Sequence, residues 1–118
     1  MPGPASADDR SPHPGLPSEH QVKAAVTAFA MLAEPTRLRL LWLVAAEELD
    51  VTSLAVRLGT TVSIVSSHLA KLRLAGLVDT RRAGRHVHYR ARDAHVRSVI
   101  AEALYHADHQ MNGIADHD

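Results

Sequence analysis

Four side chains in the last quarter of the chain have the types and spacing of a metal site. They lie in the helix-like stretch DAHVRSVIAEALYHADH and are Asp93, His95, His106 and His109. On a helix that turns about 100° and rises about 1.5 Å per residue, His95 and His106 lie about 20° apart around the axis but roughly 16 Å apart along it. The stretch therefore holds two half-sites, one at the Asp93 end and one at the His106 end.

Antiparallel pairing of this helix with a second copy would join one half-site from each chain. Each dimer would then have two equivalent sites of three nitrogens and one oxygen, a ligand set that suits tetrahedral Zn²⁺ or Co²⁺. The chain has no cysteine, which excludes thiolate sites and disulfides. The ordinary alternative is that Asp93 only caps the helix and that His106 and His109 are surface residues favoured by the helix dipole.

The formal net charge of zero hides a strong asymmetry. Residues 37–97 carry 11 of the 13 Lys and Arg but 5 of the 13 acids, whereas residues 98–118 carry four acids and no Lys or Arg. A basic middle suits a polyanion, and an acidic, histidine-bearing end suits a cation. At 118 residues the chain is one small domain, for which pairing with a second copy would help to bury apolar surface.

Neither a membrane span nor a signal peptide is expected. The longest apolar run is far too short to cross a bilayer, and the N-terminus has acids and prolines where a signal peptide needs a basic start and an apolar stretch. We therefore expect a cytoplasmic protein with no membrane partner.

Hydrophobic periodicity predicts four helices, a hairpin and a last helix within residues 19–111. The first helix begins after Ser18 or Glu19, and Pro35 lies in the first turn of the second. Two short helices at 51–59 and 61–75 end at glycines. The alternating runs LVDTRR and RHVHYRA then predict a hairpin around Ala83-Gly84, and Asp93 caps a helix to about Met111. Residues 1–18, with five prolines, are expected to form a disordered arm, and residues 112–118 a flexible tail.

The two short helices and the hairpin have the proportions of a winged helix-turn-helix. Short hydroxyl side chains on the second helix would let it enter the DNA major groove, while arginines of the hairpin would follow the backbone or the minor groove. The candidate DNA contacts are Ser63, Ser66, Ser67, His68 and Lys71 on the helix, with Arg81, Arg82, Arg85 and Arg90 on the wing. Alternatively, the serine face is merely solvated and His68 packs in the core.

Three stretches in order, FAMLAEPTRLRLLWLV, VTSLAVRLGTTVSIVSSHLAKLRLAGLVDTRRAGRHVHYR and DAHVRSVIAEALYHADH, resemble the ArsR/SmtB family of metal-sensing transcriptional repressors. The resemblance covers roughly residues 20–110. It implies a mainly α fold with a small β-hairpin wing, a recognition helix at 61–75, and a homodimer formed through the first and last helices. It also implies that D-x-H, ten residues and H-x-x-H form a metal site at the dimer interface. The family ligand matching His106 donates to a backbone carbonyl that corresponds to about Gly76.

Other metal sites of the resembled family use residues elsewhere in the chain. Val51-Thr52-Ser53 stands where some relatives carry a cysteine pair, which excludes a thiolate site for arsenic, cadmium or lead. Terminal ligands occur in some nickel and cobalt sensors of this kind, so His13, His20 and His117 are possible additional ligands that would favour Ni²⁺. His86 and His88 point to one side of a strand, where a solvated or phosphate-facing role is favoured over metal binding.

The sequence thus predicts a homodimeric repressor that binds double-stranded operator DNA without metal and is released by Zn²⁺, Co²⁺ or Ni²⁺. The alternatives are a winged-helix regulator that does not respond to metal and a histidine-based metal buffer. A metal hydrolase would need a general base in an open cleft, and the only nearby acids are Glu102 and Asp108 on a packed helix. We therefore expect no enzymatic activity.

Overall fold

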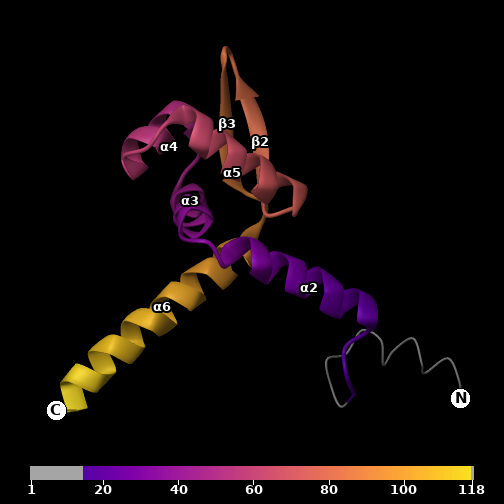
Figure 1. Ribbon diagram of the computed structural model, residues 1–118, viewed down its shortest axis with the longest axis vertical. Coiled ribbons are helices and arrows are strands. Elements are labelled where there is room, and N and C mark those ends of the chain that lie inside the picture. The colour runs from indigo at the N-terminus through magenta and orange to yellow at the C-terminus, as the bar shows by residue number, and fades with distance from the viewer. Residues whose placement is uncertain (1–14, 118) are drawn as a thin grey trace, which may run out of the picture.

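The computed structural model describes residues 15–117 of the chain, and describes side chains as far as Met111 (Figure 1). The elements in chain order are α2 (Glu19–Leu32), α3 (Pro35–Ala46), β1 (Leu49–Asp50), α4 (Val51–Leu58), α5 (Val62–Leu74), β2 (Val78–Ala83), β3 (His86–Ala91) and α6 (Ala94–His117). The order of the helices and the hairpin agrees with the sequence prediction. The predicted arm is left untested for residues 1–14, which lie outside the described part.

Side-chain caps fix where the helices begin. Ser18 and Gln21 form a capping box in which each backbone N–H donates to the other side chain, at 3.1 and 2.9 Å. Four later helices each begin with a side-chain oxygen that accepts a backbone N–H three residues on. These capping residues are Glu34, Asp50, Thr61 and Asp93. The caps at Ser18, Asp50, Thr61 and Asp93 confirm the helix starts expected from the sequence.

The wing is a three-stranded antiparallel sheet with the order β1-β3-β2. The β2–β3 hairpin was predicted, but the pairing of β1 with β3, with Leu49 opposite Tyr89, was not. A strand of two residues has no alternating pattern to detect, and β1 is defined only by its pairing with β3. The prediction of a two-stranded wing is corrected accordingly.

The last helix is longer than the sequence predicted. It continues to His117, whereas we expected it to end near Met111 and to be followed by a flexible tail. Residues 94–117 contain no proline, and Gly113 alone weakens a helix without ending it. The boundary expected at residue 111 is therefore wrong for this helix.

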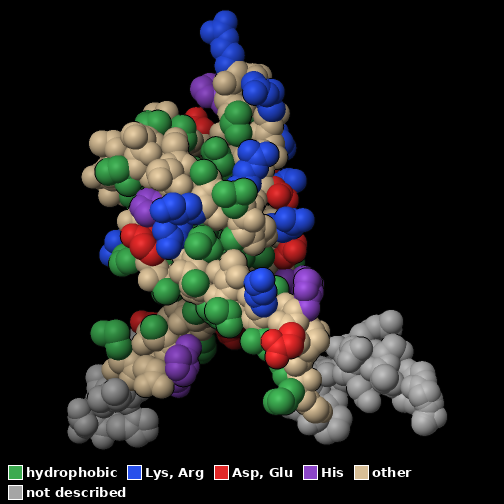
Figure 2. Space-filling model, turned by 45° about the vertical axis from the view of Figure 1, so that its right-hand side comes forward, with side chains coloured by type: hydrophobic (Ala, Val, Ile, Leu, Met, Phe, Trp, Pro, Cys, Tyr) green, Lys and Arg blue, Asp and Glu red, His purple; other side chains and the backbone are tan. Residues whose placement is uncertain are grey.

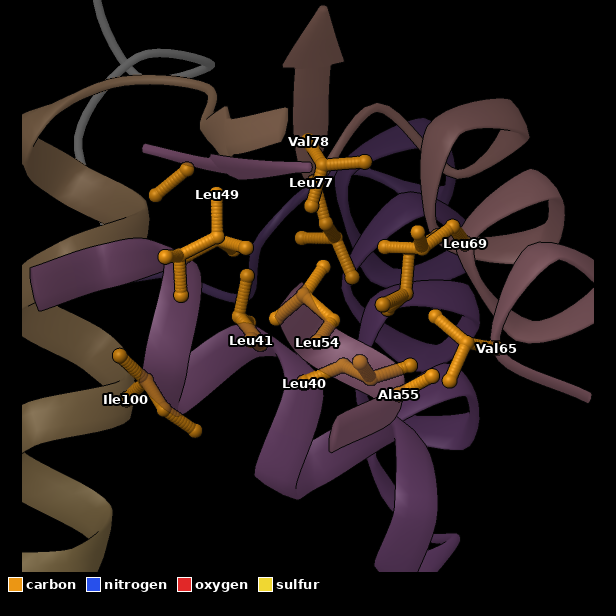
Figure 3. Close-up of a cluster of buried hydrophobic side chains, with 13 residues drawn as sticks. Leu40, Leu41, Leu49, Leu54, Ala55, Val65, Leu69, Leu77, Val78 and Ile100 are labelled. Atoms are coloured by element: carbon orange, nitrogen blue, oxygen red, sulfur yellow. The ribbon is translucent and has the colours of Figure 1, made fainter. Parts of the chain in front are cut away.

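The core lies between the helix-turn-helix, α3 and the base of the wing (Figure 3). One face of α3 supplies Leu40, Leu41 and Val44, all at most 2% exposed. Residues from α4, α5, α6 and the sheet close around that face; they include Leu54, Val65, Leu69, Leu72, Val78 and Ile100. No residue of α2 is buried. Figure 1 shows α2 and α6 projecting from the foot of this body in different directions, with the hairpin at the opposite end.

A glycine ends the first helix of the helix-turn-helix. Gly59 has φ 67° and ψ 38°, and its N–H donates to the carbonyls at the end of α4. An added Cβ would meet nothing within 4 Å, so the penalty for a side chain here comes from the left-handed backbone alone.

We expect Gly59→Ala to lower the free energy of unfolding by about 1 kcal/mol, and Gly59→Asn to lower it less because asparagine tolerates this conformation. Urea unfolding at one fixed protein concentration measures both values. An alanine variant as stable as the wild type would contradict this account of the turn.

Candidate nucleic-acid interface and metal ligands

The second helix of the helix-turn-helix presents a small polar face to solvent. Val65, Leu69 and Leu72 turn inward and are completely buried. The predicted contacts Ser63, Ser66, Ser67 and Lys71 are all exposed. The short serine side chains leave the helix backbone accessible, which suits close approach to a DNA groove.

His68 does not share this exposure. Its side chain is 19% exposed, and its Nδ1 lies 3.4 Å from Nη1 of Arg37 and 3.9 Å from Oε1 of Glu34. Both neighbours lie at the α2–α3 corner, away from the serine face. The structure therefore places His68 at the edge of the exposed face of α5, largely covered by the α2–α3 corner.

The two faces of the wing differ in how their charges are arranged. Because side chains alternate along a strand, the register places Arg81 beside His88 on one face and Arg82 beside Val87 on the other. On the first face, Arg81 Nε donates to Glu48 Oε1 at 2.7 Å, and Arg90 lies 3.5 Å from the other oxygen of that carboxylate. These contacts, Arg81 first, lower the pKa of Glu48 and keep it ionised. The two arginines are thus partly neutralised within the protein.

The second face of the wing is turned toward α5. Tyr89, on this face, lines a hollow of about 500 Å³ together with Ser66 and Arg73 of α5. Arg82 lies on the same face, Arg85 lies at the hairpin turn, and neither forms an ion pair within the described side chains. Figure 2 shows Lys and Arg side chains gathered along the wing as far as its tip. Sequence reasoning missed Arg73 and Tyr89, because only the folded hairpin brings Tyr89 next to α5.

The histidines of the wing have a local partner. His86 Nδ1 lies 3.5 Å from Oδ2 of Asp50, and the rings of His86 and His88 meet edge to face with centroids 6.5 Å apart. The pKa of Asp50 is lowered, chiefly by the Ser53 backbone N–H that it caps and also by the nearby histidines. Asp50 thus connects the wing to the start of α4.

The four candidate metal ligands are all exposed on α6. Asp93 caps the helix by accepting the Val96 N–H at 3.0 Å, which is the main cause of its lowered pKa. His106 Nε2 lies 3.4 Å from the Gln110 amide, and the His109 ring stacks on Tyr105 with centroids 6.1 Å apart. Within the described residues of one chain, no three His, Asp or Glu side chains form a group that could hold a metal ion.

The possible additional ligands are not brought to these groups. His20 is exposed in the first turn of α2, and Figure 1 shows that end of α2 far from the C-terminal part of α6. His13 lies outside the described residues. His117 ends α6, but its side chain is outside the described part.

The start of α6 lies directly beside the end of α5. Arg92 donates its backbone N–H to the Leu77 carbonyl at 3.0 Å, and its guanidinium lies over Gly76, where an added Cβ would be 3.2 Å from Nη1. Gly76 has φ 76°, a conformation that favours glycine. The Asp93 half-site therefore begins one residue beyond a contact with the end of the predicted recognition helix.

The two projecting helices expose large apolar side chains. Phe29 is 65% exposed, Val26 60% and Val99 48%. Phe29 and Val99 line an apolar hollow of about 250 Å³ between α2 and α6, which also includes His95. Such a surface is unusual for a chain that remains alone in water.

The fold and the exposed basic wing define a winged helix-turn-helix protein of the DNA-binding class. Residues 34–80 match the family described as bacterial regulatory protein, arsR family. The HTH-type transcriptional regulator KmtR of Mycobacterium tuberculosis is 44% identical over 92% of this chain and 82% of its own length. The regulator NmtR of the same organism is 39% identical over 87% of each chain. The protein belongs to the ArsR family.

A solved structure agrees with this assignment. The homodimeric winged helix-turn-helix DNA-binding domain of a possible ArsR-family regulator from Mycobacterium bovis matches with a TM-score of 0.75 and 27% identity, over 81% of this chain and 92% of its own. The relatives are transcriptional regulators, which confirms the expectation that this protein is not an enzyme. Within the described residues, no helix is long and apolar enough to cross a membrane.

The two faces of the wing predict different effects for two adjacent arginines. We expect Arg82→Ala to weaken binding to specific and random DNA alike, and to reduce the slope of log affinity against log salt by about one unit. Arg81→Ala should cause a smaller loss, because Glu48 already compensates the Arg81 charge.

Glu48→Gln is the matched control, since it frees Arg81 and should raise affinity for random DNA. Fluorescence anisotropy across a salt series measures all three variants. Equal losses for the two arginine variants would show that both faces of the wing contact DNA.

Proposed function

We propose that this protein is a homodimeric, metal-responsive repressor, which binds operator DNA without metal and leaves it when metal is bound. The proposed ligands are Asp93 and His95 of one protomer with His106 and His109 of its partner, and the proposed ions are Zn²⁺, Co²⁺ or Ni²⁺. The observation that carries the proposal is the position of two incomplete donor pairs at separate ends of one exposed face of α6.

The dimer is supported by the uncovered apolar side of the molecule. Phe29 and Val99 line the apolar hollow between α2 and α6, and Val26 is 60% exposed on α2. Covering this surface with the same surface of a second copy is the usual solution for a symmetric pair. The solved relative described as homodimeric has the same winged fold.

The donor chemistry of α6 fits a divalent transition metal. The pKa of Asp93 is lowered, chiefly by the Val96 N–H that its Oδ1 accepts, and the proposal assigns the other carboxylate oxygen, Oδ2, to the metal. His95, His106 and His109 are exposed, and imidazole is a ligand for each of the three ions. A bound ion would cross-link the two α6 helices at each site.

A route from this site to DNA is supported by the contact between α5 and α6. Gly76 lies beside Arg92 at the start of α6, so His106 of the same chain, on the far part of the helix, is remote from it. Antiparallel pairing would bring the partner's His106 to this end instead. There its second ring N–H could donate to the Gly76 carbonyl, as the ligands of metal sites commonly donate to a backbone acceptor. That bond would hold the two recognition helices at a spacing unsuited to the operator.

The dimer can be tested by sedimentation. We expect a dimer at micromolar concentration, and we expect Phe29→Glu to shift it toward monomer because the new charge would be buried against a partner. Val56→Glu is the control, since Val56 is 76% exposed on α4, away from α2 and α6. A folded wild-type monomer at micromolar concentration would contradict both the dimer and the shared site.

The affinity for metal and the release of DNA that metal causes can be measured separately. Titrating the protein–operator complex with Zn²⁺, Co²⁺ and Ni²⁺ in parallel should release DNA, with a coupling of about 1 to 3 kcal/mol for the effective ion. Asp93→Ser keeps the helix cap but removes a ligand, so it should mainly weaken metal binding. His106→Asn is expected to retain part of the metal binding and to lose much of the release.

The same titrations distinguish the alternatives. A metal buffer would bind the ion and ignore DNA, whereas an unresponsive regulator would bind DNA and ignore the ion. His86→Ala is the control for histidine loss outside the proposed site. If His106→Asn binds metal and still leaves DNA with undiminished coupling, the route through Gly76 is wrong.

A further inference from the structure

A polar cluster at the α2–α3 corner joins three helices through one guanidinium. Arg37 Nε donates to the carbonyl of Met31, in the last turn of α2, at 2.6 Å. Its backbone N–H donates to Glu34, the N-cap of α3, at 2.8 Å. Its Nη1 lies 3.4 Å from Nδ1 of His68, near the middle of α5. Arg37 therefore contacts the end of α2, the start of α3 and the candidate reading helix.

The contact between Arg37 and His68 has one possible direction as a hydrogen bond. A guanidinium has only donors, so Arg37 donates and the His68 Nδ1 accepts. Glu34 Oε1 lies 3.9 Å from the same nitrogen, beyond hydrogen-bond distance, and the Arg37 backbone N–H is the main cause of its lowered pKa. A guanidinium, an imidazole and a carboxylate thus meet at this corner.

The position of His68 on α5 suits a support rather than a DNA contact. On a helical wheel it lies roughly 140° from Ser63, between the serine face and the buried Val65–Leu69 side. Its side chain is largely covered, while Ser66 and Ser67 remain exposed. A directional contact at this edge restrains rotation of α5 about its axis. The apolar contacts of the buried side are non-directional and therefore restrain this rotation less sharply.

We propose that His68 and Arg37 form a positioning pair, which sets the orientation of α5 for DNA without touching DNA. Because the same guanidinium holds the end of α2, the pair also fastens the reading helix to a helix of the proposed dimer interface. This inference rests on the proposed function in one respect, namely that α5 is the element that reads DNA.

The test is a double-mutant cycle on DNA affinity. The probe is a duplex selected from a random pool by the wild-type protein, and the variants are His68→Leu, Arg37→Gln and their combination. We expect His68→Leu to lower affinity about tenfold, and the double variant to lose little more than Arg37→Gln alone, because both changes remove the Arg37–His68 contact and Arg37→Gln also removes the bond to Met31. The salt slope should stay unchanged, since neither side chain neutralises a phosphate.

Conservative replacement separates positioning from general stability. The amide oxygen of His68→Asn lies as many bonds from Cβ as the Nδ1 it replaces and can accept from Arg37, so this variant should recover most of the affinity while His68→Leu does not. Circular dichroism at the assay temperature confirms that each variant is folded. If the leucine variant melts early, His68→Ala, which has no acceptor in its side chain, replaces it in the cycle.

The outcomes distinguish failure of the positioning pair from failure of the proposed function. Additive losses would show that Arg37 and His68 act independently, and a change in the preferred sequence with His68→Asn would show that His68 contacts DNA directly. Either result would overturn the positioning pair alone. Failure of the wild type to select any duplex would overturn the proposed function, and the positioning pair with it.

Discussion

The burial of one face of α3 is the constraint on which the rest of the structure depends. Leu40, Leu41 and Val44 lie at the centre of the core, and α4, α5, the sheet and α6 all pack around them. A core this small can bury only the surfaces that pack against α3, because a short chain buries a limited fraction of its surface. The uncovered parts of α2 and α6 follow directly from this limit. The surface proposed to pair with a second copy is therefore what remains after α3 has been covered.

The distribution of charge follows from the same packing. The apolar face of the sheet must turn toward α5 and the core, so the alternating polar residues of β3 and β2 gather on the outer face. There Glu48 balances Arg81 and Arg90, whereas Arg82 is left on the side of α5. A basic patch read from sequence counts all of these arginines equally. The folded sheet separates them into charges that are paired within the protein and charges available to a polyanion.

Features formed by residues close together in the sequence could be predicted, whereas contacts between residues far apart in the sequence could not. The caps Ser18, Asp50, Thr61 and Asp93 and the glycine that ends α4 act over three or four positions, so their patterns were readable. The Arg37–His68 and Arg81–Glu48 contacts span 31 and 33 residues and have no local signature. The same applies to β1, which exists only through its pairing with β3. The candidate ligands of α6 could be chosen from helix geometry, but whether they meet depends on a second chain.

In the proposed dimer, metal binding and association are linked by the way the ligands are divided. Each chain supplies only two donors to a site, and within the described residues no single chain gathers three. An ion held by four ligands therefore favours the associated state, and association in turn raises the affinity for the ion. The same linkage makes the response sensitive to the end of α5, because Arg92 and Gly76 place that end beside one of the half-sites. In this proposal, α6 would form the interface, carry the metal ligands and lie beside the end of α5, so no separate signalling element would be needed.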